Sequence, residues 1–76
     1  MNNVKRAQLS QATSLLRRAE TIVEGVIDKE QDVLDNLAEY FEYTDRYQKI
    51  EDAIDNLDSA IKSIGEAIED IEAAAS

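Results

Sequence analysis

Large apolar residues recur along residues 47–75 at alternating spacings of three and four. They are Tyr47, Ile50, Ile54, Leu57, Ile61, Ile64, Ile68 and Ile71. This is the a/d pattern of a helix that packs along its whole length against another helix. Alanine stands one residue before an a position at Ala53, Ala60, Ala67 and Ala74, so one flank is small enough for close approach. The pattern predicts a helix over about 45–75.

A second amphipathic pattern precedes it and predicts a helix over about 4–38. The a/d positions are Leu9, Ala12, Leu16, Ala19, Val23, Val26, Val33 and Leu37, with Leu15 and Ile22 on one flank and Ile27 and Leu34 on the other. The apolar stripe therefore drifts across the helix, as it does on a straight helix of a globular bundle. Glu30 falls on an a position, where looser packing is expected.

The two helices are expected to be joined by a turn at about 39–45, with Thr44 or Asp45 capping the second helix. Helices of similar length with a short connection form an antiparallel hairpin. Charge agrees with this arrangement, because Lys5 and Arg6 near the start of the chain would meet the acids near its end. We therefore predict an all-α fold, with residues 1–76 forming a single helical-hairpin domain of coiled-coil type.

Wide apolar stripes on only two helices would leave part of each stripe in water. Dimerisation into a four-helix bundle would cover it, and isoleucine-rich a and d positions favour more than two helices in the core. The residues expected in this core and dimer seam are Leu16, Val23, Val26, Ile50, Ile54, Leu57, Ile61, Ile64, Ile68 and Ile71.

Composition argues against catalysis. The chain contains no Cys and no His, which removes thiol chemistry, the commonest general base and the commonest metal ligand. We expect no enzymatic activity, no metal site and no cofactor. No apolar run has the length of a membrane span, and the first residues lead into no signal-peptide pattern, so a cytoplasmic location is expected.

Negative charge is concentrated after residue 27. Residues 1–27 carry four bases and two acids, whereas residues 28–76 carry four bases and fifteen acids. Coulomb repulsion disfavours nucleic acid and anionic membranes as direct partners, so a protein with a basic surface is the expected partner. The candidate acidic contact residues are Asp28, Asp32, Asp35, Glu39, Glu42, Asp45, Glu51, Asp52, Asp55 and Asp58.

All four aromatic residues lie near the expected turn, namely Tyr40, Phe41, Tyr43 and Tyr47. Packed inward they would close the end of the core, and packed outward they would form an alternative contact patch.

The segments 30–39, 44–46 and 50–57 read EQDVLDNLAE, TDR and IEDAIDNL. Together they resemble a family of short acidic helical proteins encoded on phages and integrating mobile elements. That family commonly has Pro before the position of Glu39, where this chain has Ala38. This departure leaves open whether the first helix ends near Asn36 or continues to about Tyr43. The resemblance implies a mobile-element origin and supplies no catalytic residues.

Two functions follow as hypotheses. The first is a non-enzymatic acidic module, such as a phage or mobile-element inhibitor, that occupies the basic nucleic-acid-binding surface of a host or defence protein. The alternative is a structural or dimerisation module with no inhibitory role.

Overall fold

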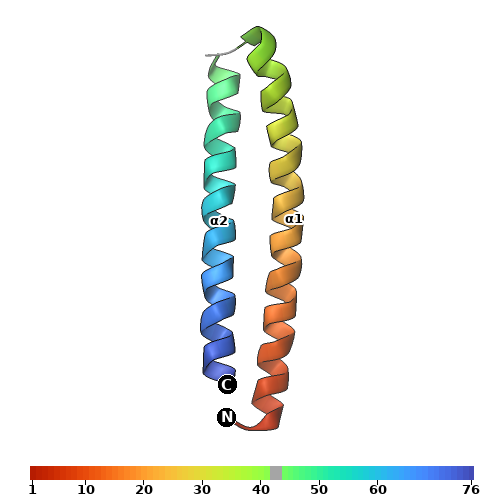
Figure 1. Ribbon diagram of the computed structural model, residues 1–76, viewed down its shortest axis with the longest axis vertical. Helices are drawn as coiled ribbons and strands as arrows, with labels where there is room; N and C mark the ends of the chain where they lie inside the picture. Colours follow the sequence, from red (N-terminus) through yellow and green to blue (C-terminus); the bar gives the residue numbers. More distant parts are fainter. Residues whose placement is uncertain (42–43) are drawn as a thin grey trace.

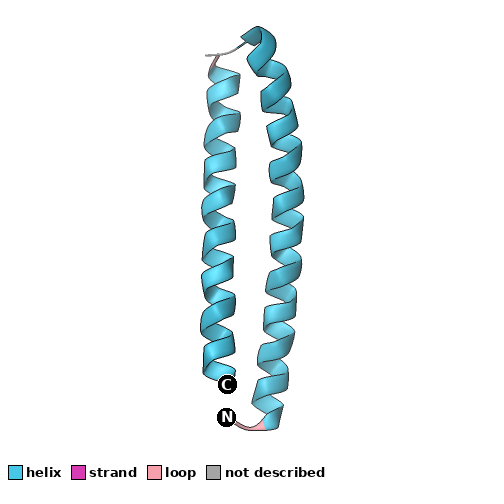
Figure 2. Cartoon of the chain, in the orientation of Figure 1, coloured by secondary structure: helices cyan, strands magenta, loops and turns pink. Residues whose placement is uncertain are grey.

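The chain folds into two antiparallel helices (Figures 1 and 2). The computed structural model describes residues 1–41 and 44–76, without the side chains of residues 38–41. Helix α1 spans Asn3–Phe41 and helix α2 spans Asp45–Ala75. Both termini lie at the same end, and the two helices pack against each other along their length. The predicted all-α helical hairpin is confirmed.

Helix α1 starts at a cap that the chain supplies for itself. The Lys5 backbone N–H donates to Asn2 Oδ1 at 2.8 Å, and the Arg6 N–H donates to the Asn2 carbonyl at 3.0 Å. These bonds satisfy amides that have no partner within a first helical turn. At its other end α1 continues to Phe41, so the predicted end at about residue 38 is wrong. With Ala38 in place of a proline, nothing in the sequence 38–41 interrupts the helix.

Helix α2 begins where the sequence predicted and is capped by Thr44. This residue has an extended backbone, and its Oγ1 accepts a hydrogen bond from the Tyr47 N–H at 3.2 Å. The Gln48 N–H donates to the Thr44 carbonyl at 3.1 Å. Asp45 is the first helical residue and places a negative charge at the positive end of the helix dipole.

The inner face of α2 follows the predicted a/d pattern. Ile54 and Ile68 are 7% and 6% exposed, and they are the most buried residues of this helix. The remaining seam residues are half-buried, namely Tyr47, Ile50, Leu57, Ile61, Ile64 and Ile71. Ala53, Ala60 and Ala67 are also half-buried, in keeping with a flank of small residues beside the seam.

The inner face of α1 differs from the prediction by a rotation of the helix. Leu34 is buried and Leu16, Val23 and Ile27 are half-buried, but Val26 is 41% exposed. Val26 therefore lies beside the line of contact between the two helices, and its predicted place in a dimer seam stays a prediction. The reason is the drift of a 3.6-residue helix, which brings Ile27 rather than Val26 toward α2.

The hairpin is a thin rod. Its Cα extents are 57 × 15 × 12 Å and its radius of gyration is 17.2 Å, against about 11 Å for a compact domain of this length. The accessible surface is 5658 Å², about 1,000 Å² more than the roughly 4,650 Å² expected of a compact protein of 8.5 kDa. Each helix therefore buries one side only.

We expect Ile54→Ala to lower the free energy of unfolding by about 2 kcal/mol, because it removes buried methyl groups from the only core the hairpin has. The neighbouring exposed substitution Asp55→Ala is the control and should change the free energy by less than about 0.5 kcal/mol. Urea denaturation followed by circular dichroism at one protein concentration measures both. Equal effects of the two substitutions would contradict the assigned inner face.

Candidate interaction surfaces

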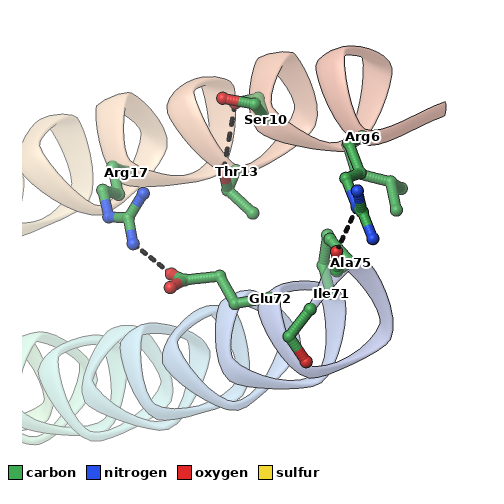
Figure 3. A pocket seen from close by; sticks show the side chains of 9 residues that line it. Arg6, Ser10, Thr13, Arg17, Ile71, Glu72 and Ala75 are labelled. Atoms are coloured by element: carbon green, nitrogen blue, oxygen red, sulfur yellow. Dashed lines mark hydrogen bonds and ion pairs between the residues drawn. The ribbon is translucent and has the colours of Figure 1, made fainter. Parts of the chain in front are cut away.

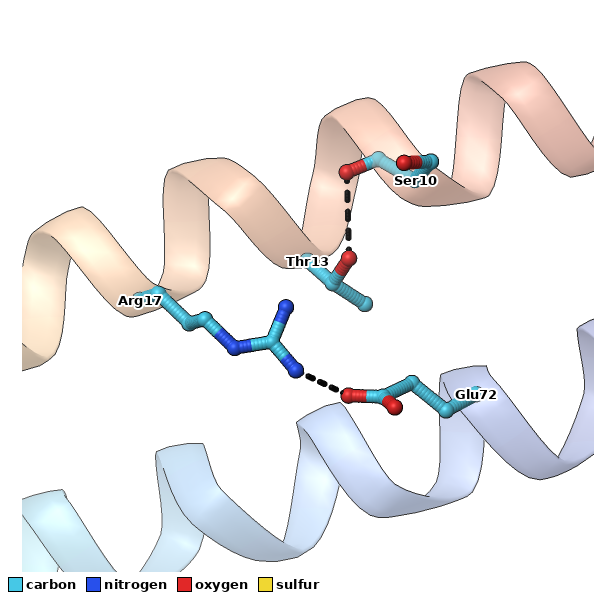
Figure 4. Close-up of polar contacts among 4 residues, drawn as sticks. All are labelled: Ser10, Thr13, Arg17 and Glu72. Carbon is cyan, nitrogen blue, oxygen red and sulfur yellow. Dashed lines mark hydrogen bonds and ion pairs between the residues drawn. The ribbon is translucent and has the colours of Figure 1, made fainter.

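One side of the hairpin carries the polar contacts between the helices. Arg17 Nη2 donates a hydrogen bond to Glu72 Oε1, and the two side chains form an ion pair between α1 and α2 (Figure 4). Nearer the termini, Arg6 Nε donates to the Ala75 carbonyl oxygen at 2.9 Å (Figure 3). That carbonyl lies in the last turn of α2, where carbonyl oxygens lack helical partners. The expected meeting of basic and acidic ends thus involves Arg17 and Glu72, while Arg6 binds a backbone oxygen.

An open cleft of about 320 Å³ lies between the two helices at this end (Figure 3). Leu9 and Ile71 supply its apolar lining, and Thr13, only 5% exposed, lies within it. The Thr13 hydroxyl donates to the Ser10 carbonyl at 3.0 Å, so its proton is already engaged (Figure 4). The two arginines of the cleft are engaged as well, as described above.

The polar contacts identify which way each helix face points. On α1, Arg17 and Glu20 mark the polar side. The Glu20 carboxylate lies over Gly65 of α2, where a Cβ added to the glycine would be 3.8 Å from Glu20 Oε2. Two residues along a helix correspond to a rotation of about 200°. Leu15 precedes Arg17 by two residues and Ile22 follows Glu20 by two, so both point to the opposite side of the hairpin.

That opposite side is apolar and open. Leu15 is 59% exposed, Ile22 is 60% exposed and Val26 is 41% exposed. With the half-buried Ala12 and Ala19 they form a line spaced alternately by three and four residues, which we call the outer apolar line of α1. The sequence showed Leu15 and Ile22 only as a flank of one stripe. The same spacing rule, applied to Ala12, Leu15 and Ala19, would have identified a second seam.

Alanines of α2 lie on the same open side. Ala67 and Ala74 each stand two residues after a residue of the polar side, Gly65 and Glu72, and so point away from it. Ala53 and Ala60 continue the same heptad position. The open side thus combines large apolar residues on α1 with small ones on α2.

The acidic candidates are distributed over both helices. Seven of the ten are exposed, namely Asp28, Asp32, Asp35, Asp45, Asp52, Asp55 and Asp58. Glu51 is half-buried, the Glu39 side chain is not described, and Glu42 lies outside the described residues. Asp28 and Asp35 follow Arg17 by about three and five whole helical turns, so they lie on the polar side of the hairpin. Asp45 and Asp52 lie roughly opposite the buried Ile54 on α2, so they point away from α1. Where the structure describes side chains, none of these aspartates is ion-paired with a base.

The aromatic patch is described only in part. Tyr47 is half-buried on the inner line of α2. Tyr40 and Phe41 belong to α1, but their side chains are not described, and Tyr43 lies outside the described residues. Whether these three pack inward or outward stays a prediction.

Among the described residues, no three acidic, histidine or cysteine side chains are grouped so that they could hold a metal ion. Neither α1 nor α2, over the parts described, has a stretch long and apolar enough to cross a membrane.

Comparison with protein-family models, curated proteins and solved structures finds no significant match to the chain. The resemblance to mobile-element proteins therefore stays a sequence-based prediction.

The ion pair between Arg17 and Glu72 should contribute little to stability. Both side chains are more than half exposed, at 54% and 53%, so water and salt screen their attraction. In a double-mutant cycle with Arg17→Gln and Glu72→Gln, we expect a coupling free energy of about 0.5 kcal/mol that declines in 1 M salt. A coupling energy above about 2 kcal/mol, unchanged by salt, would contradict this.

Proposed function

We propose that the chain is a non-enzymatic protein-interaction module that assembles as a homodimeric four-helix bundle. The observation that carries this proposal is the outer apolar line of α1, where Leu15, Ile22 and Val26 are exposed on one side of the hairpin. A contiguous line of large apolar side chains in water is the usual mark of an interaction surface. Its spacing by three and four residues suits a partner that is itself a helix.

The exposed area supports a partner of similar size. The excess of about 1,000 Å² over a compact protein is close to the roughly 800 Å² that each partner buries in a standard interface. One broad side of the rod, 57 × 15 Å between Cα atoms, spans about 850 Å². A second hairpin laid along this side would convert two half-covered inner seams into one enclosed core.

The sequence of α2 also favours a second pair of helices. Isoleucine occupies most of its a and d positions, and in coiled coils this composition favours more than two helices. Leu57 and Ile64, in the middle of the helix, are only half-buried within one hairpin. A partner on the open side would cover them, and the alanine flank beside them permits its close approach.

Ile22→Lys should convert the dimer into a monomer. A lysine in the outer apolar line would either be buried as a charge in the interface or hold the second copy away. We therefore expect the dissociation constant of the dimer to rise at least about 100-fold, a loss of about 3 kcal/mol in binding free energy. Thr21→Lys, at the adjacent exposed position, adds the same charge outside this line and serves as the matched control. Sedimentation equilibrium should give twice the 8.5 kDa chain mass for the parent and the control, and the chain mass for Ile22→Lys.

Two results would contradict the proposal. One is a parent protein that sediments as a folded monomer at micromolar concentration. The other is an Ile22→Lys variant that keeps the parent's dimer affinity. Circular dichroism shows whether each variant is still helical, so loss of the dimer can be told from loss of the fold.

A second candidate function is that the acidic outer faces bind a basic protein surface and compete there with nucleic acid, as an inhibitor from a mobile element would. The supporting observation is the stripe Asp28, Asp32 and Asp35, which is exposed on α1 and has no basic partner among the described residues. Packing a second copy on the open side would leave this stripe accessible. Opposite charge on the partner would speed the encounter and fix its orientation.

Replacing Asp28, Asp32 and Asp35 by Asn should weaken capture of basic proteins from host lysate at low salt. Glu66→Gln, Glu69→Gln and Asp70→Asn remove the same charge from exposed positions elsewhere and form the control. A protein that is retained by the parent and the control, lost from the aspartate variant and eluted by salt would support electrostatic binding. Equal retention by all three proteins would contradict it.

A further inference from the structure

We infer that the two hairpins of the dimer lie antiparallel, with the tip of each beside the termini of the other. The two-fold axis then crosses the rods at mid-length instead of running along them. This inference rests on the proposed dimer and specifies its partner as a second copy in one of two possible orientations. The distribution of charge along the rod leads to it, and the central position of the outer apolar line is compatible with it.

Most of the net negative charge lies in the tip half of the rod. The contact between Glu20 and Gly65 shows which residues of α1 and α2 lie at the same height. On the tip side of this height, residues 21–65 carry twelve acids and four bases, a balance of −8. On the terminal side, residues 1–20 and 66–76 carry five acids and four bases, a balance of −1. These two balances add to the net charge of −9.

Orientation decides how strongly the two copies repel each other. With the tips together, two halves of −8 would lie side by side, and the acids that approach within about one Debye length of each other, about 8 Å at physiological salt, would repel. With the hairpins antiparallel, each half of −8 lies beside a half of −1. The tip halves repel even when Glu39 and Glu42, whose side chains are not described, are left out, because the balance is then −6.

The outer apolar line lies where an antiparallel dimer requires it. Helix α1 spans Asn3–Phe41, so Ile22 is its central residue, and the line from Leu15 to Val26 is centred near mid-length. An axis between residues 20 and 21 sets Leu15 opposite Val26 of the second copy, and Ala19 opposite its Ile22. Large residues thus face small or medium ones, while the rods overlap along their full length. If the outer apolar line lay near one end of α1, two antiparallel hairpins joined through it would overlap along only part of their length.

Distances between spin labels test the orientation directly. The chain has no cysteine, so a single introduced cysteine gives one label per copy. Gln48 is exposed in the first turn of α2 at the tip, about 17 residues or 25 Å from the height of Gly65. For Gln48→Cys we expect a distance of about 50 Å between copies in the antiparallel dimer. With the tips together, the same labels would be separated only by the width of the bundle, less than about 30 Å.

Thr21→Cys provides the matched control, because this exposed residue lies close to the proposed axis and its labels stay within about 30 Å in either orientation. A long distance for Gln48→Cys with a short one for Thr21→Cys supports the antiparallel dimer. Short distances for both labels overturn the orientation but keep the dimer. No distance between copies for either label, with a monomer mass in sedimentation, overturns the dimer itself.

Discussion

Two helices share only one line of contact, and this constraint shapes the whole molecule. Each helix can cover the inner side of the other, and no further element is present in the described chain to cover the remaining sides. Leu34, Ile54 and Ile68 are therefore the only buried apolar side chains among those that the structure describes. The other seam residues are half-buried, so a single hairpin covers its apolar seams only in part.

The sequence predicted α2 better than α1 for a physical reason. In α2 the large apolar residues occupy one line, so the repeat determines which face turns inward. In α1 they occupy two adjacent lines, and either Val26 or Ile27 could face α2. Periodicity cannot decide between two lines about 100° apart. The packed pair decides it, because Arg17 and Glu72 lie on one side of the hairpin and Leu15 and Ile22 lie on the other.

The candidate sites show the same limit. Counting charges located the acidic half of the chain, and the exposed aspartates there agree with a solvated surface. The sequence did not reveal which aspartates lie on the polar side of the hairpin, because that depends on how the helices pair. The extension of α1 to Phe41 likewise depended on one residue, Ala38, where a proline would have favoured an earlier end.

Apolar burial and charge repulsion have different roles in the proposed dimer. Covering the exposed parts of Leu15 and Ile22 would contribute about 1 to 2 kcal/mol for each side chain, or about 4 to 8 kcal/mol over two copies. Association costs a comparable amount in lost freedom of motion, so the alanine flank and the half-buried isoleucines must supply the surplus. Apolar burial is similar in both orientations of the second hairpin, whereas repulsion between the tip halves is not. In the proposed dimer, the outer apolar line would therefore determine whether two copies associate, and the charge would determine how they are oriented.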